Sequence, residues 1–338
     1  MPFGKLYGAV MNVRNALYEK GFFSSYALGA KTVSIGNITV GGTGKTPLVA
    51  FAAETLFEAG EKVGILTRGY GRENPKKRVL VMDGREILAA AKKAGDEPFE
   101  LAEKLLGKAV IIADADRVSA GIWAREKFGI TVFVLDDAFQ HRKVKRDLDI
   151  VCIDATNPFG NGLVLPSGIL REAVENLKRA GAIVITRANL IEKIENLKSE
   201  ISKYTNAPIF ISHNEFSNLT SVKNLNETLI SSSNIQNPKS KSALAFCALG
   251  NPNNFFEQLR REKFTVTATK IFPDHHFYTP NDILMIEKKA RENGAEILIT
   301  TGKDAAKLDG LKSNFPVFTA QNQIIFDDRK EIINLLLS

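Results

Sequence analysis

Short apolar runs alternate with longer stretches of helical periodicity along most of the chain. The runs are rich in β-branched residues, as expected for strands buried on both faces of a sheet. Strands are predicted at residues 32–35, 63–67, 110–113, 131–135, 150–153, 183–186, 243–249, 264–271, 296–300 and 316–319. Helices are predicted at residues 45–59, 96–106, 117–127, 253–262, 281–292 and 328–337, with a further one between 153 and 183. This order predicts βαβ units and a mainly parallel sheet, which is an α/β fold.

The first segment has the pattern of an amphipathic helix. Its apolar residues recur at helical spacing on one stripe, and these are Leu6, Ala9, Val10, Val13 and Leu17. Polar residues lie opposite, and lysine and arginine add positive charge. We expect residues 1–30 to pack on the domain behind them, to contact a membrane surface, or to do both.

The alternating pattern weakens between residues 214 and 240, where Asn, Ser, Thr and Lys predominate. This composition is typical of a linker or an exposed β-ribbon. We therefore predict a first domain at residues 31–213, a linker at 214–241 and a smaller α/β domain at 242–338. Two domains joined in this way predict a cleft that closes on a ligand.

The composition limits the class of protein and of partner. An apolar fraction of 44% and a charged fraction of 25% in 338 residues are ordinary for a globular protein. The net charge of +7 favours an anionic partner, such as a nucleotide, a nucleic acid, phospholipid headgroups or a phosphorylated substrate. Cys152 and Cys247 each lie in an apolar run, as buried cysteines of a reducing compartment do. We find no spanning segment and no signal peptide, so we expect a cytosolic protein or one bound to the cytosolic face of a membrane.

A glycine-rich segment follows the first predicted strand and opens the helix predicted at 45–59. Its residues are Gly41, Gly42, Thr43, Gly44, Lys45 and Thr46. A strand, such a loop and a helix in succession indicate a Walker A phosphate loop, in which backbone N–H groups and the helix N-terminus bind phosphates. Lys45 would reach the β- and γ-phosphates of ATP, and Thr46 would bind Mg²⁺. Thr39 replaces the first glycine of the strict pattern, and the sequence still predicts a P-loop NTPase-type sheet with flanking helices.

Two aspartates, Asp136 and Asp137, follow the strand predicted at 131–135. Adjacent carboxylates in the crevice of a parallel sheet repel each other unless a cation lies near, which favours a Mg²⁺ site. A role in a turn or a helix cap remains open for one of the two. His141 and the basic residues after it could bind a substrate phosphate or form a solvated face.

Two further segments carry groups that could do acid–base chemistry. The sequence GDEP places Asp96 and Glu97 at the start of a predicted helix, where an N-cap is the ordinary role for an aspartate. The sequence FPDHH places Asp274 beside His275 and His276 in the second domain. A neighbouring carboxylate can tune a histidine as a base, but the spacing alone leaves catalytic and structural roles open.

Several blocks occur in a definite order along the chain. They read SIGNITVGGTGKTP, LTRGYGR, AGDEP, LDDAFQHRKVKRDLDI, LPSGILRE, FPDHHFYT and TTGKDAAKL. Together they resemble the tetraacyldisaccharide 4′-kinases, the lipid A 4′-kinases of Gram-negative bacteria. The resemblance implies transfer of the γ-phosphoryl group of ATP, with Mg²⁺, to the 4′-hydroxyl of tetraacyldisaccharide 1-phosphate, forming lipid IVA. It also implies a peripheral position on the cytoplasmic side of the inner membrane, with a tetraacylated glucosamine disaccharide lipid as substrate.

The resemblance implies an acid–base pair drawn from both domains. Asp96 matches the family's base for the hydroxyl proton, and His275 matches its partner, with Asp274 beside it. Closure of the two domains would then assemble the pair around bound substrates.

The other matching positions carry charge near the phosphates. Asp136, Asp137 and Glu97 resemble acids that organise metal or phosphate. Arg171 matches an arginine near the transferring phosphate, and Arg68 is a candidate for binding substrate phosphate.

Two other functional classes fit parts of the sequence. A membrane-associated P-loop ATPase or GTPase switch shares the phosphate loop, but Val40 stands where partitioning ATPases have a lysine. A nucleic-acid-binding module is suggested by charge alone, and no recognition motif supports it. We therefore expect neither a nucleic-acid partner nor an obligate protein partner.

Overall fold

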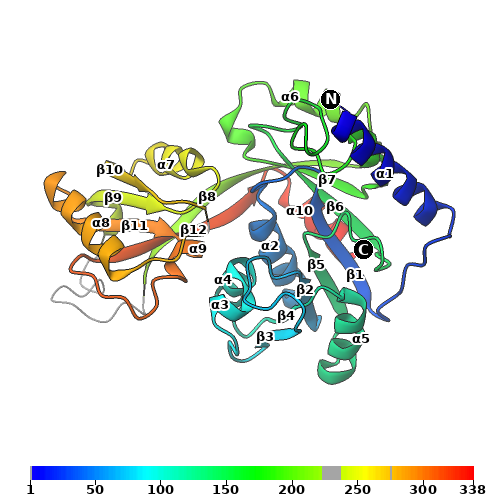
Figure 1. Cartoon of the computed structure of the whole chain (residues 1–338), viewed down its shortest axis with the longest axis horizontal. Coiled ribbons are helices and arrows are strands. Elements are labelled where there is room, and N and C mark those ends of the chain that lie inside the picture. The colour runs from blue at the N-terminus through cyan, green and yellow to red at the C-terminus, as the bar shows by residue number, and fades with distance from the viewer. Residues whose placement is uncertain (1, 223–236, 275) are drawn as a thin grey trace. The chain divides into compact units, whose positions relative to one another are not determined.

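The computed structural model describes residues 2–222, 237–274 and 276–338. They divide into two compact units, a larger one of Met1–Asn214 with Ile324–Ser338 and a smaller one of Glu215–Gln323. The chain passes between the units twice, within two neighbouring strands, β8 (Ile209–Ser221) and β12 (Val317–Phe326) (Figure 1).

The larger unit contains a mixed α/β sheet with helices on both faces. In chain order its remaining elements are α1 (Pro2–Glu19), β1 (Lys31–Asn37), α2 (Lys45–Glu58), β2 (Val63–Thr67), β3 (Val79–Asp83), α3 (Ala91–Ala94), α4 (Asp96–Lys104), β4 (Ala109–Ala113), α5 (Arg117–Phe128), β5 (Val132–Asp136), β6 (Leu148–Asp154), the 3-10 helix η1 (Val174–Arg179), β7 (Ala182–Thr186), the 3-10 helix η2 (Ala188–Leu190), α6 (Ile194–Ile201) and α10 (Arg329–Leu337). The strand order is β8-β7-β6-β1-β5-β2-β4-β3. The pairings among these strands are parallel except that of β3 with β4, so the predicted parallel sheet is confirmed.

Alternate residues of the central strands enter different cores. Val132 and Val134 of β5 pack with α2, α4 and α10 on one face of the sheet. Phe133 and Leu135 of the same strand pack with α5 on the other face. Because the side chains of a strand alternate in direction, both faces of the sheet must be covered, which explains the continuous apolar runs in the sequence.

The smaller unit repeats this layered design. Its remaining elements are η4 (Pro238–Ser240), β9 (Ser242–Cys247), α7 (Pro252–Arg261), β10 (Thr265–Ile271), α8 (Pro280–Glu292), β11 (Ile297–Thr301) and α9 (Gly302–Ala305). The strands β10, β9, β11 and β12 pair in parallel in that order. Helix α7 covers one face of this sheet and α8 covers the other.

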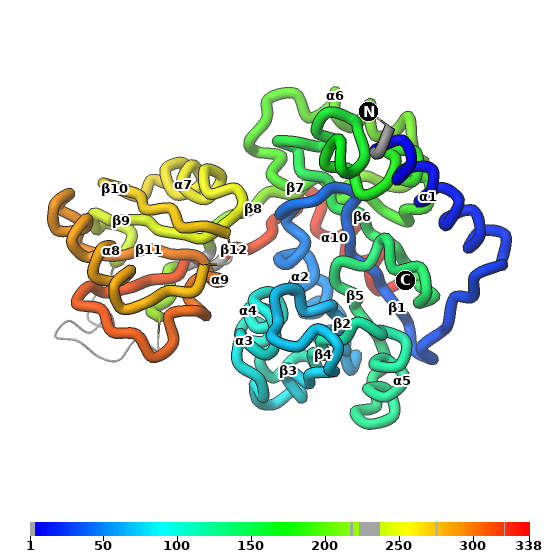
Figure 2. The backbone as a smooth tube through the Cα atoms, viewed as in Figure 1, coloured from blue at the N-terminus to red at the C-terminus, as the bar shows by residue number. Residues whose placement is uncertain are grey.

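The end of the chain departs from the predicted domain boundary. Residues 324–338 were expected in the smaller domain, but α10 belongs to the larger unit, to which the red segment returns in Figure 2. Phe326 and Leu336 enter the core that contains α2, and the ring of Phe326 lies 5.0 Å from that of Phe51. Lys31 Nζ also donates to the carbonyl of Leu336 at 2.9 Å. The helical pattern predicted an apolar face and did not identify the surface that covers it.

Other differences are local. The helix expected between β6 and β7 is the 3-10 helix η1, and neither β3 nor α3 was predicted. Strand β8 extends to Ser221, into the segment predicted as a linker, and residues 223–236 of that segment lie outside the described residues.

Candidate active site

The glycine-rich loop and the aspartate pair lie at the same edge of the larger sheet. Strands β1 and β5 are parallel neighbours, with Ile35 in register with Asp136. The loop follows the end of β1, and the two aspartates stand at the end of β5. Ligands of open α/β sheets bind outside the carboxyl ends of the strands, where the strand order reverses, and β1 lies at such a position.

The phosphate loop is anchored at Thr43, just before α2 begins. Its hydroxyl accepts a hydrogen bond from Asn37 Nδ2 at 2.9 Å, and its carbonyl accepts one from Thr186 Oγ1 at 2.9 Å. Gly44 has a φ of 80° and caps α2, and a Cβ there would approach Thr186 Cγ2 to 3.1 Å. These contacts fix the loop at the start of α2, and helix N-termini present unpaired N–H groups that can bind phosphate.

Lys45 and Arg171 converge on Asp137. Lys45 Nζ lies 3.5 Å from Asp137 Oδ1, and Arg171 Nη1 donates to both carboxylate oxygens at 2.9 and 2.8 Å. Burial acts to raise the pKa of Asp137, but Lys45 and Arg171 outweigh it and lower that pKa. Asp137 also has a φ of 48°, an uncommon backbone conformation that directs the chain away from β5 at this point. Asp137 therefore holds two cations beside the phosphate loop.

Asp136 lies in a different environment. One of its oxygens, Oδ2, accepts a hydrogen bond from Thr67 Oγ1 at 2.9 Å, whereas Oδ1 is buried with no hydrogen-bond partner among the described residues. Burial, followed by the charges of Glu97 and Asp137, raises the pKa of Asp136 to about 6. Arg117, which the sequence did not single out, donates to the carbonyl of Asp136 at 2.6 Å and to that of Asp137 at 3.3 Å. The carbonyls of the aspartate pair are thus fixed by a buried arginine.

Asp96 is the first residue of α4 and is 7% exposed. Gly95 occupies the N-cap position, so the ordinary explanation of this aspartate as an N-cap does not apply. A carboxylate in the first turn of a helix is stabilised by the helix dipole. Glu97, the next residue, lies close enough to Asp136 to raise its pKa, which places the start of α4 near the aspartate pair.

The start of α4 depends on Gly95, its N-cap residue. Gly95 has a φ of 93°, and a Cβ there would lie 2.7 Å from the carbonyl oxygen of Tyr70. We expect Gly95→Ala to lower the free energy of unfolding by about 1–3 kcal/mol more than Gly60→Ala, measured by urea denaturation. Gly60 is the matched control, because its φ is 91° but no atom lies within 4 Å of the added Cβ. Equal losses in the two variants would contradict the close packing of Gly95 against the Tyr70 carbonyl.

His141 is held neutral at the same edge. Burial, followed by the charge of Arg117 and then of Arg146, lowers the pKa of His141 to about 4. The unfolded chain takes up this proton near pH 6.5 and the folded chain only near 4, so acidification through that window favours unfolding. The free energy of unfolding of the native protein should therefore fall between pH 6.5 and 4. We expect His141→Gln to make this fall smaller, by at most about 1.4 kcal/mol per pH unit. Urea titrations at several pH values measure the free energy of unfolding of the native protein and the variant. The same dependence of this free energy on pH in both proteins would contradict the prediction.

The remaining predicted residues are placed as follows. Arg68 is exposed at the end of β2 and lies close enough to Arg117 to lower the pKa of that guanidinium, after burial. In the smaller unit, the carboxylate of Asp274 lies against Gly250. His276 Nε2 lies 3.0 Å from Asp282 Oδ2 in the cap of α8, and His275 lies outside the described residues.

The sheet, the anchored phosphate loop and the aspartate at the end of the neighbouring strand define a P-loop nucleotide-binding protein. A model of the family described as Tetraacyldisaccharide-1-P 4'-kinase matches residues 1–338. The chain belongs to this family.

Individual relatives agree with this assignment. The tetraacyldisaccharide 4'-kinase of Desulfotalea psychrophila is 36% identical over 323 residues, covering 95% of this chain and 90% of the relative. The protein of that name from Chlorobaculum parvum is 38% identical over 306 residues, covering 90% and 82%. The crystal structure of LpxK from Aquifex aeolicus in complex with ATP superimposes with a TM-score of 0.78 at 32% identity, covering 99% of this chain and 96% of that one.

Proposed function

We propose that this protein transfers the γ-phosphoryl group of ATP to the 4′-hydroxyl of tetraacyldisaccharide 1-phosphate. The observation that carries the proposal is the convergence of Lys45 and Arg171 on Asp137 beside the anchored phosphate loop. Phosphoryl transfer depends on positioning and on stabilising charge on the transferring group, and this geometry supplies cations for both.

The phosphate loop would hold the donor. Backbone N–H groups of Gly41, Gly42, Thr43, Gly44, Lys45 and Thr46 would bind the β- and γ-phosphates, with the N-terminus of α2 beneath them. Lys45 and Arg171 would balance the charge that develops on the transferring group.

The acceptor hydroxyl would lose its proton to Asp96. An alcohol is a weak nucleophile at neutral pH, so a positioned carboxylate that takes the proton as the bond to phosphorus forms lowers the barrier. Burial of Asp96 at the start of α4 supports this role, because it limits the movement of the carboxylate. We assign His275 and Asp274 to the acid–base chemistry of the transfer, as their match to the family motif implies. Arg68 and His141 are our candidates for contact with the substrate's own phosphate.

The acids at the sheet edge fit a divalent cation. One oxygen of Asp136 has no hydrogen-bond partner in the described part of the chain, and the carboxyl has a raised pKa and the charge of Glu97 nearby; these features favour a cation there. Asp136, Asp137, Glu97 and the hydroxyl of Thr46 would hold Mg²⁺, which neutralises charge on the phosphates when bound. Within the described ranges, no three His, Cys, Asp or Glu side chains form a ready metal site. The nucleotide phosphates would therefore have to supply part of the coordination.

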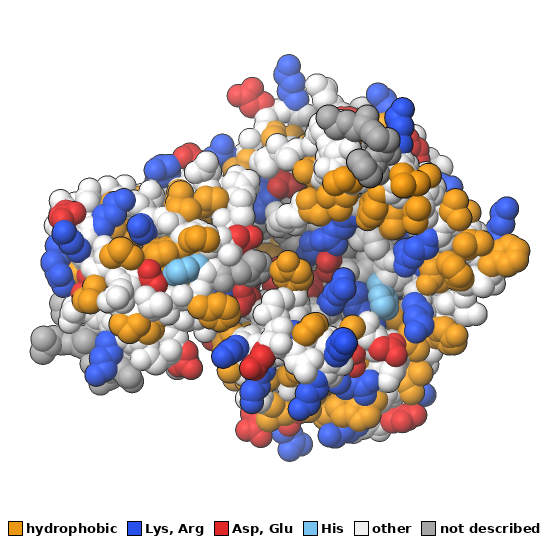
Figure 3. All heavy atoms as spheres, viewed as in Figure 1, with side chains coloured by type: hydrophobic (Ala, Val, Ile, Leu, Met, Phe, Trp, Pro, Cys, Tyr) orange, Lys and Arg blue, Asp and Glu red, His pale blue; other side chains and the backbone are white. Residues whose placement is uncertain are grey.

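Helix α1 supports contact with a lipid surface. Apolar side chains gather over α1 and the segment after it, with lysine and arginine between them (Figure 3). The most exposed of them are Leu6 (64%), Val10 (57%), Val13 (60%) and Phe22 (74%). No helix of the described residues is long and apolar enough to cross a bilayer. We propose that this face lies on the cytoplasmic side of the inner membrane, where an acylated substrate resides.

The proposal is tested by comparing ADP release with phosphoryl transfer. The protein is supplied with ATP, magnesium chloride and detergent-dispersed tetraacyldisaccharide 1-phosphate, and both products are measured. We expect one phosphate on the disaccharide for each ADP formed, and little ADP without the lipid. ADP release without any lipid phosphorylation would indicate a nucleotide-hydrolysing switch and would refute the proposal.

A further inference from the structure

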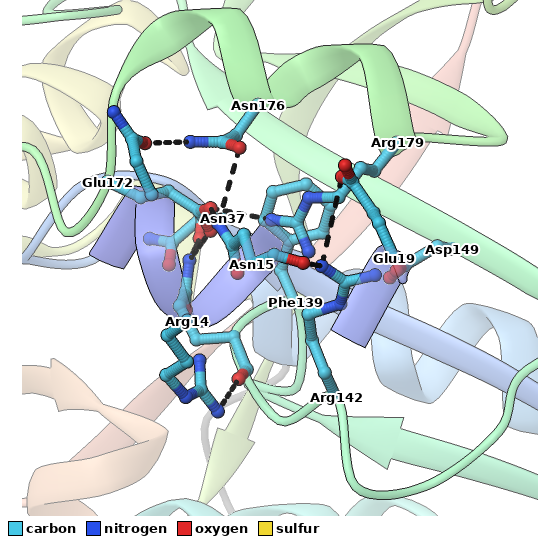
Figure 4. A network of polar contacts seen from close by, with 12 residues as sticks. Arg14, Asn15, Glu19, Asn37, Phe139, Arg142, Asp149, Glu172, Asn176 and Arg179 are labelled. Atoms are coloured by element: carbon cyan, nitrogen blue, oxygen red, sulfur yellow. Dashed lines mark hydrogen bonds and ion pairs between the residues drawn. The ribbon is translucent and has the colours of Figure 1, made fainter. Parts of the chain in front are cut away.

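A fully buried carboxylate lies between helix α1, the 3-10 helix η1 and the loop after β5. Glu172 is 0% exposed. Its Oε2 accepts hydrogen bonds from Asn15 Nδ2 at 3.0 Å and from Arg179 Nη2 at 2.6 Å, and its Oε1 accepts one from Gln140 Nε2 at 2.8 Å (Figure 4). A buried charge with several directed partners occupies one position, since any displacement breaks hydrogen bonds that no water replaces.

The network continues from Glu172 to the phosphate loop. Gln140 Nε2 also donates to the backbone carbonyl of Asn37, the last residue of β1, at 2.8 Å. Asn37 Nδ2 donates in turn to Thr43 Oγ1, within the loop, at 2.9 Å. The exposed fractions of Asn15, Asn37 and Thr43 are only 3%, 0% and 4%. A chain of buried and half-buried hydrogen bonds thus connects α1 to the phosphate loop.

A second connection runs through the backbone. The N–H of Arg171, which precedes Glu172, donates to the carbonyl of Ile38 at 2.7 Å, just before the phosphate loop. The side chain of Arg171 holds Asp137. A displacement of Glu172 would therefore act on the loop and on the cation pair together.

The C-terminal half of helix α1 contacts the loop that follows the aspartate pair. Arg14 Nη2 donates to the carbonyl of Gln140 at 3.0 Å, and Arg142 Nη1 donates to the carbonyl of Asn15 at 2.8 Å. The guanidinium of Arg142 also lies 5.2 Å from the centre of the Tyr18 ring. The last turns of α1 and the residues after β5 therefore hold each other in place.

We propose that Asn15, Glu172 and Gln140 are positioning residues for the phosphate loop, so that docking of α1 sets the affinity for ATP. They act through Asn37 and Thr43. Their effect on ATP is independent of the lipid acceptor, so it can be tested even if the proposed kinase activity fails. A merely structural role would change the stability of the protein and leave the affinity of the folded protein for ATP unaltered.

The test is a double-mutant cycle on ATP binding. Asn15→Leu, Gln140→Met and the double variant are titrated with ATP in magnesium chloride by calorimetry. We expect each single change to raise the Kd for ATP about fivefold or more. The Kd of the double variant should be close to that of the single variant with the higher Kd. The proposal would be overturned by an unchanged Kd in folded Asn15→Leu. It would also be overturned if the fold-change in Kd of the double variant equalled the product of the two single fold-changes.

Asn12→Leu is the matched control on the same helix. Asn12, one turn before Asn15, accepts a hydrogen bond from Asn176 Nδ2 at 3.3 Å, and Asn176 Oδ1 accepts one from Asn15 Nδ2 at 3.2 Å. Asn12 is therefore at the edge of the network and is joined to Glu172 only through Asn176 and Asn15. We expect this variant to bind ATP as the native protein does, and an equal loss of affinity would overturn the specific link. Circular dichroism and thermal melting confirm that each variant is folded. If Asn15→Leu does not fold, Asn15→Ala takes its place in the cycle, and the same results support or overturn the proposal.

Discussion

Lys45→Met is expected to lower kcat for phosphoryl transfer by about 10³-fold and to raise the KM for ATP. The ammonium lies at the start of α2, 3.5 Å from Asp137, where the donor phosphates would be held. Methionine keeps most of the length of the side chain and removes the charge. In the variant Arg171 Nη1 still donates to both oxygens of Asp137, so this carboxylate keeps a cationic partner. Steady-state kinetics with varied ATP measure the effect.

The matched control is Lys62→Met, which makes the same change at an exposed lysine before β2. We expect its kinetic constants to equal those of the native protein. If Lys45→Met retained more than about a tenth of the native kcat, the assignment of this loop to the donor phosphates would be wrong.

Asp96→Asn is expected to lower kcat by about 10²–10⁴-fold while the Kd for ATP changes little. The amide has the shape of the carboxylate and cannot accept the proton of the acceptor hydroxyl. Because Asp96 begins α4 without serving as its N-cap, the substitution leaves the cap at Gly95 in place. Single-turnover kinetics and ATP titration separate the two effects.

Glu100→Gln serves as the control one turn later in α4, where Glu100 pairs with Lys104 at 3.1 Å. Its activity should remain close to native. A large loss of ATP affinity in Asp96→Asn would instead assign Asp96 to the binding of nucleotide or metal.

Local elements were predictable because their signals are local. The phosphate loop was found from residues adjacent in sequence, and β2 has the predicted bounds of 63–67. Each strand buried on both faces gave a continuous apolar run, which is independent of the strand's neighbours. Strand β3 was missed although residues 79–82 are apolar, because an antiparallel edge strand lies outside the alternation of parallel strands and helices.

Contacts between distant residues were not predictable from the pattern. The sequence predicts Asp137 as a metal ligand, but no pattern in it shows that Lys45 and Arg171 contact this carboxylate. Glu172 follows Arg171 directly, but its partner Asn15 lies 157 residues away and no spacing rule connects them. The partner surface of α10 was unpredictable for the same reason, because amphipathicity shows that a face is buried and not what buries it.

The most direct test of the proposed function is the position of the transferred phosphate. The protein is incubated with ATP, magnesium chloride and tetraacyldisaccharide 1-phosphate, and the lipid product is examined by ³¹P NMR with correlation to the sugar protons. We expect a second phosphate monoester coupled to the proton at the 4′ carbon, absent from reactions with Lys45→Met. A phosphate at any other position, or an unmodified lipid beside ADP, would contradict the account.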